Sequence, residues 1–151
     1  MPSSKSQIPN SNTSSDVQER ACIEAVLDVK ASAKPDLEER TFIFARDVRA
    51  LVRKLTRNPT NWEDSKQLIR SSGSVGANYI EANESLGEKD FAMHIRISRK
   101  ESKESEFWLR LLNHSGNSEH KEEIVRLSME CHEFRKIFSA ILRNSINRQG
   151  K

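Results

Sequence analysis

Two glutamates in the second half of the chain have the spacing of metal ligands. Glu101 and Glu104 are three residues apart, so both side chains lie on one side of a helix. A di-iron site in a helical bundle needs a Glu-x-x-His pair on each of two helices, and the sequence contains no such pair. We expect instead that Glu101 and Glu104 join Asn78 and Glu81 in a partly buried polar network, which fixes helix register or subunit contacts.

Other catalytic groups lack the partners that their chemistry requires. Glu122 and Glu123 could hold magnesium in a hydrolase, but no second acidic set follows one helical turn away. Cys131 and His132 are sequence neighbours, so on a helix they point in different directions and do not form a catalytic pair. The sequence therefore predicts no enzymatic activity, no metal and no cofactor, with a metal-dependent hydrolase as the weakest alternative.

A row of arginines near residue 50 is a stronger candidate for binding. Helical geometry places the four side chains within about 80° of arc, nearly opposite an apolar stripe. This stripe consists of Phe44, Val48, Leu51 and Leu55. Such a ridge suits phosphate groups, although a solvated helix face is an equally good interpretation. The ridge consists of Arg46, Arg49, Arg53 and Arg57.

A second basic set, Arg143, Arg148 and Lys151, ends the chain. No aromatic residue is interleaved with either set, so base stacking on single strands is not expected. Trp62 is expected instead to pack at the start of a helix. Nucleic acid, if bound, is expected to bind by charge and shape.

Four amphipathic helices are predicted to position these residues. Their expected ranges are 36–57, 61–83, 88–113 and 119–148, the first ending at Asn58-Pro59. The last helix has the strongest apolar periodicity. Its stripe consists of Ile124, Leu127, Cys131, Phe134, Phe138 and Ile141.

Short connections between these helices predict an all-α, antiparallel up-down-up-down four-helix bundle. The expected organisation is a largely disordered extension over 1–35 with a short helix over 16–33, a bundle over 36–148, and a tail over 149–151. Gly73 and Gly76, inside the second helix, each cost about 1 kcal/mol relative to Ala, so tight helix packing is expected there.

Composition excludes several classes of protein. Lys and Arg total 25 against 22 for Asp and Glu, so bulk charge does not indicate a strongly basic nucleic-acid protein. Two cysteines without a CxxC pair argue against structural zinc and a disulfide scaffold. No leader-like or membrane-spanning apolar segment is recognised, so we expect a soluble, cytoplasmic protein.

Two stretches resemble a known family of four-helix-bundle proteins. RSSGSVGANYIEA, Arg70 to Ala82, is similar to the family's Ser-small-Asn-Ile-x-Glu pattern, and KESKESEFWLRLL, Lys100 to Leu112, is similar to its Lys-Glu-Ala-x-Glu-Thr-x-Tyr-Trp-Leu pattern. The family includes proteins encoded in intervening sequences of bacterial large-subunit ribosomal RNA genes and the accessory variability proteins of diversity-generating retroelements. The resemblance covers residues 38 to 146, with mild departures at Tyr79, Ser102 and Phe107.

The resemblance implies assembly and binding without catalysis. It implies a homopentamer, and for the retroelement members a reverse transcriptase partner and nucleic-acid binding. Phe42 and Ile43 lie off the core stripe of the first helix and are expected at a subunit interface. We therefore expect an oligomer that binds RNA or DNA without strong sequence specificity, or binds a reverse transcriptase. The alternative is a scaffold or adaptor that recognises only protein.

Overall fold

The computed structural model describes residues 17–18 and 36–150. The chain divides into two units, Met1–Pro35 and Asp36–Lys151, and the fold is that of the second unit. The expected N-terminal tail and the expected helix over 16–33 lie outside the described residues, apart from Val17 and Gln18, whose backbone is helical.

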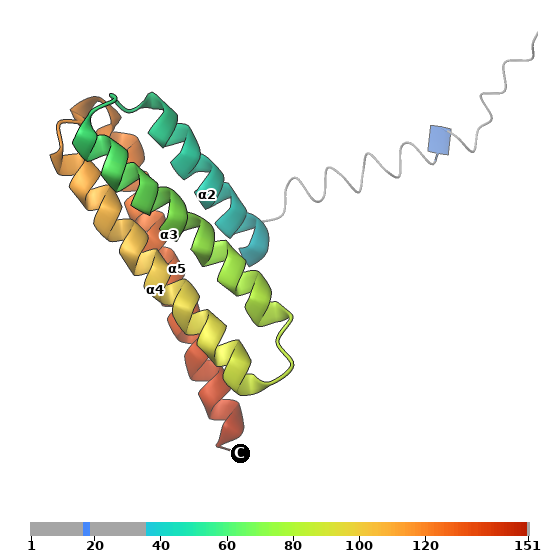
Figure 1. Ribbon diagram of the computed structural model, residues 1–151. Helices are drawn as coiled ribbons and strands as arrows, with labels where there is room; N and C mark the ends of the chain where they lie inside the picture. Colours follow the sequence, from blue (N-terminus) through green and yellow to red (C-terminus); the bar gives the residue numbers. More distant parts are fainter. Residues whose placement is uncertain (1–16, 19–35, 151) are drawn as a thin grey trace, which may run out of the picture. The chain divides into compact units, whose positions relative to one another are not determined.

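The second unit is an antiparallel four-helix bundle, as predicted. Figure 1 shows that successive helices run in opposite directions. α3 packs against α4, and α4 against α5, along much of their length, whereas α2 and α5 contact each other less. The elements are α2 (Leu37–Lys54), α3 (Pro59–Asn83), α4 (Glu88–His114), a 3-10 helix (Ser118–His120) and α5 (Lys121–Gln149).

Two capping residues set where α2 and α3 begin. The Asp36 carboxylate accepts a hydrogen bond from the Glu39 amide, and the Asn58 side chain caps α3 in the same way. Pro59 is the first residue of α3, where its missing N–H costs nothing. The first helix was predicted to end at residue 57, but α2 ends at Lys54, and Pro59 starts the next helix two residues before the predicted Asn61.

The core confirms the predicted stripe of the first helix, and that of the last helix as far as Phe138; beyond it Leu142 is buried, whereas the predicted Ile141 is half-buried. Phe44 and Phe134 are fully buried, with ring centroids 5.4 Å apart in an edge-to-face arrangement. Phe138 lies beside Phe134 with a centroid separation of 6.2 Å. The Phe44–Phe134 contact joins α2 to α5, where the helix pair is otherwise sparsely packed.

Small residues bring α3 close to both of its neighbours. Buried Ser105 of α4 donates a hydrogen bond to Ser71 of α3, at 2.8 Å. A Cβ added to Gly76 would lie 2.8 Å from the Thr41 hydroxyl of α2, so no larger residue fits without movement. The tight packing expected at Gly76 is confirmed. Gly73 is less constrained, since a Cβ there would lie 3.5 Å from the Arg49 guanidinium.

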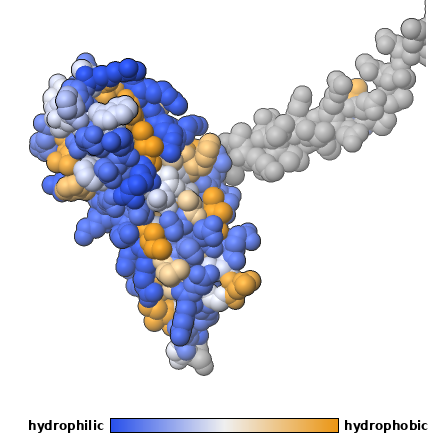
Figure 2. Space-filling view, viewed as in Figure 1, coloured by the Kyte–Doolittle hydropathy of each residue, from blue (hydrophilic) through white to orange (hydrophobic). Residues whose placement is uncertain are grey.

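Several large apolar side chains remain on the surface of the bundle. Phe42, which was expected at an interface, is 60% exposed, and Ile43 is half-buried. On the face seen in Figure 2, hydrophobic patches are separated by a mostly hydrophilic surface. Within the described residues, no helix is long and apolar enough to cross a membrane.

Candidate nucleic-acid interface

The predicted arginine ridge is not a continuous row of free charges. Arg46 pairs with Asp47 at 2.9 Å, and Arg126 of α5 binds the same carboxylate at 3.1 Å. Arg49 is half-buried and donates to the backbone carbonyl of Ala45. Arg46 is therefore exposed but paired with a carboxylate, and Arg49 is held against its own helix.

The other two ridge arginines lie near the connection between α2 and α3. Arg53 is exposed on the last turn of α2, and Arg57 is exposed beyond the end of that helix. Neither forms an ion pair with another described residue. The ridge therefore contributes two exposed arginines that form no ion pair with a described residue, and both lie at the same end of the bundle.

The two described arginines of the C-terminal set are also separated. Arg143 lines a groove between α4 and α5, whereas Arg148 lines a different hollow beside the start of α4. Lys151 lies outside the described residues. Of the two, only Arg143 lines the groove between α4 and α5.

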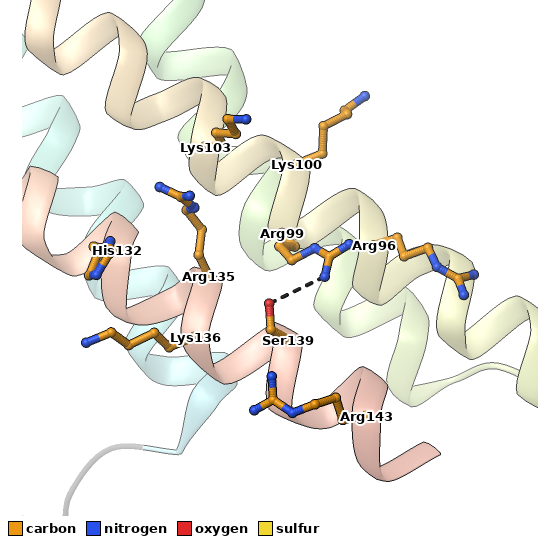
Figure 3. A pocket seen from close by; sticks show the side chains of 9 residues that line it. All are labelled: Arg96, Arg99, Lys100, Lys103, His132, Arg135, Lys136, Ser139 and Arg143. Carbon is orange, nitrogen blue, oxygen red and sulfur yellow. Dashed lines mark hydrogen bonds between the residues drawn. The ribbon is translucent and has the colours of Figure 1, made fainter. Parts of the chain in front are cut away.

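Basic side chains line almost all of this α4–α5 groove. Seven of its nine lining residues are Lys or Arg, and no acidic residue lines it. Figure 3 shows the side chains approaching from both helices, with Lys100 pointing away from α5. α4 contributes Arg96, Arg99, Lys100 and Lys103. α5 contributes His132, Arg135, Lys136, Ser139 and Arg143.

Neighbouring carboxylates neutralise only part of this charge. Arg135 pairs with Glu106 at 2.7 Å, and Lys136 pairs with Glu133 at 3.1 Å. The α4–α5 groove keeps an excess of positive charge, and because these charges lie close together their potentials add. Within the described residues, no ion pair is made by Arg96, Lys103 or Arg143.

Of the residues that line the groove, only Arg143 was predicted from the sequence as a binding residue, although the spacing of the others on α4 was a usable signal. Arg96, Arg99, Lys100 and Lys103 follow the i, i+3, i+4, i+7 spacing of one helix face. Glu101 interrupts this run, and its buried carboxylate lies on the side of α4 that faces Arg70 of α3. Only the packing of α4 against α5 shows that the two basic faces meet.

The polar residues of the predicted network lie in separate places. Arg70 of α3 bridges Glu104, which it contacts closely, and buried Glu101, at 3.9 Å. Trp108 also donates its indole N–H to Glu104, at 3.4 Å. Glu101 and Glu104 thus join α3 to α4 through an arginine that was not predicted to take part.

Asn78 and Glu81 are not members of this cluster. Asn78 donates to the Ser74 carbonyl at 2.9 Å, and its side-chain oxygen lies 3.3 Å from Nδ1 of His94. Glu81 is exposed. In place of one network, the structure has two separate sets of contacts between α3 and α4: Arg70 with Glu101 and Glu104, and Asn78 with His94. Glu81 takes part in neither set.

The described bundle contains little that could perform catalysis. No group of three or more His, Cys, Asp or Glu residues that could hold a metal occurs within residues 36–150. Cys131 is fully buried, and burial raises the pKa of its thiol far above the ordinary value, which leaves it without nucleophilic thiolate. His132, next to it, faces the α4–α5 groove instead.

The fold and its groove define a small helical-bundle protein with a surface lined by basic residues. A family model, described as 23S rRNA-intervening sequence protein, matches residues 36–140, and the chain belongs to this family. The resemblance seen in the sequence is thereby confirmed. The match spans all of α2, α3 and α4 and most of α5.

A solved structure is also similar. It is a protein of unknown function from the S23 ribosomal protein family of Bacteroides thetaiotaomicron, with a TM-score of 0.62 and 27% sequence identity. The similarity covers 70% of this chain and 96% of that one. A comparison with curated proteins finds no match.

Proposed function

We propose that this protein is a non-enzymatic oligomeric bundle that binds RNA or DNA through phosphate contacts in the α4–α5 groove. The observation that carries the proposal is the lining of that groove, with seven Lys or Arg side chains and no carboxylate. A row of cations along two helices suits a polyanion with regularly spaced charges. The family name itself refers to an intervening sequence of 23S rRNA.

The groove supports binding without base recognition. Arg, Lys and His donate to phosphate oxygens in any sequence, and no aromatic residue lines the groove to stack on bases. Binding of this kind releases counterions, so its affinity falls steeply as salt rises. The partner proposed for this surface is therefore RNA or DNA of mixed sequence.

Self-assembly into a homopentamer is part of the proposal. Its support is the apolar surface of the subunit, where Phe42, Phe107 and Met129 are each more than half exposed. Repetition of the groove around a ring would multiply the positive field. A reverse transcriptase is the protein partner that we propose for this ring.

The alternative function, a scaffold that binds only protein, is favoured by one observation. Phe107 and Leu111 are exposed one helical turn apart on α4, which is the spacing of an apolar docking face. Salt distinguishes the two functions, because an apolar interface changes little with ionic strength.

The proposal is tested by titrating the wild-type protein against mixed-sequence RNA and a DNA duplex at several salt concentrations. We expect log affinity to fall linearly with log salt. Absence of binding in low salt, or affinity that does not depend on salt, would reject the groove as a phosphate site. Sedimentation of the same protein tests the oligomer, and a single monomeric species would remove the ring.

A further inference from the structure

A hollow at the connection between α2 and α3 combines one exposed aromatic ring with free cations. Trp62 lies on the first turn of α3 and is 64% exposed. Arg53 and Arg57 line the same hollow from the end of α2 and from the connection. Val52 and nearly buried Leu55 add apolar surface beside the ring. We name this the Trp62 hollow.

The local fold explains why Trp62 does not pack into the core. The preceding residue, Asn61, takes the inward position and is 2% exposed. Its side-chain amide donates to the Thr56 carbonyl and to the Asn117 side chain, both at 2.9 Å. One residue further along a helix turns by about 100°, which directs Trp62 outward. The expectation that Trp62 packs at the start of this helix was wrong.

The charges in the hollow suit an anion next to the ring. Glu63, the carboxylate in its lining, pairs with Lys66 at 3.1 Å. The Lys66 ammonium also lies 5.9 Å from the centre of the Trp62 ring. Arg53 and Arg57, in contrast, pair with no carboxylate in the described part of the chain. They remain available to a ligand.

We propose that the Trp62 hollow binds an unpaired nucleotide of RNA or DNA, an inference that rests on the proposed nucleic-acid function and adds a substrate class to it. An exposed indole offers a flat face on which a base stacks, and the neighbouring guanidinium groups hold the flanking phosphates. Bases inside a duplex are already stacked and do not reach the ring. The hollow therefore gives a preference for single-stranded segments, which the α4–α5 groove does not provide.

This inference changes an expectation drawn from the sequence. No aromatic residue is interleaved with the arginine ridge in sequence, which predicted binding without stacking. Packing of α3 beside the end of α2 nevertheless places Trp62 in one hollow with Arg53 and Arg57. The stacking residue comes from the next helix.

The test compares Trp62→Ala with Leu86→Ala, which removes an exposed apolar side chain from the connection between α3 and α4. Each variant is first checked for native melting temperature and oligomeric state. Affinity is then measured for a single-stranded oligonucleotide and for the blunt duplex of the same sequence at one salt concentration. Trp62→Ala should weaken single-strand binding by about 5-fold to 150-fold, the range for loss of one stacked base, and leave duplex binding unchanged.

Two further measurements separate stacking from other roles. In a Trp108→Phe background, the emission of Trp62 should be quenched by the single strand and not by the duplex. Arg53→Gln combined with Arg57→Gln should make the single-strand salt slope shallower by about 0.7 for each lost contact.

The outcomes distinguish this inference from the proposed function. Unchanged single-strand affinity in Trp62→Ala, or an equal loss in Leu86→Ala, would overturn the hollow while leaving the groove intact. Equal losses for single strand and duplex would overturn it as well, since a stacking platform acts only on free bases. Absence of binding by the wild type would overturn the proposed function and this inference together.

Discussion

Removal of three cations from the α4–α5 groove should make nucleic-acid binding much less sensitive to salt. Arg96, Lys103 and Arg143 line the groove and pair with no carboxylate in the described residues, so Gln at these positions deletes charge without leaving an acid unpaired. If each contacts one phosphate, the slope of log affinity against log salt on duplex DNA should become shallower by about 0.9 per contact, or about 2.7 in total. Between about 50 and 200 mM salt, the wild type should then lose about 40-fold more affinity than the variant.

A control with the same net charge makes this measurement specific. Gln at Lys89, Arg110 and Lys121 also removes three exposed positive charges that pair with no carboxylate in the described residues, lowering the net charge from +3 to 0, but none of these residues lines the groove. Anisotropy titrations of a labelled duplex at four or more salt concentrations give the slopes. Equal slopes for the two triple variants would refute the groove as the contact surface, because binding would then follow net charge alone.

Further predictions concern the bundle itself. Phe134→Ala should lower the free energy of unfolding by about 3–5 kcal/mol, because it opens a cavity among buried aromatic rings; an unchanged denaturation midpoint would contradict this. Gly76→Ala should destabilise by about 1–3 kcal/mol through the close approach of α2, whereas Gly73→Ala should stabilise by up to about 1 kcal/mol through helix propensity. If denaturation shows that the two variants change the free energy of unfolding equally, this difference in packing is refuted. In a Cys22→Ser background, Cys131 should react with a thiol reagent at about pH 8 only as fast as the protein unfolds, and rapid labelling of the native protein would disprove its burial.

The helices could be predicted from sequence because their apolar periodicity matches what the core buries. Phe44 of α2 and Phe134 of α5 stand at the expected core positions. The end of the first helix could be placed less accurately, because a proline is compatible both with the end of one helix and with the start of the next. Pro59 starts α3, and α2 already ends at Lys54, which leaves Arg57 outside the helix that was to carry the ridge.

The candidate sites depended on contacts between helices, which a single sequence does not specify. The spacing of the α2 arginines was visible in the sequence, but their partners were not. The pairing of Arg46 with Asp47, and of Arg49 with a backbone carbonyl, depends on how the side chains are placed. The α4–α5 groove arises only when the basic faces of two helices meet. Trp62 likewise joins Arg53 only because α3 folds back beside α2.

The most direct test of the central claim is a lysine acetylation footprint of the wild-type protein, with and without mixed-sequence RNA in low salt, read by mass spectrometry. Lys103 and Lys136 line the α4–α5 groove, whereas Lys89 and Lys121 are exposed outside it. Binding in the groove predicts that RNA slows acetylation of Lys103 and Lys136 and leaves Lys89 and Lys121 unchanged. Equal acetylation of the groove lysines with and without bound RNA would contradict the proposed interface.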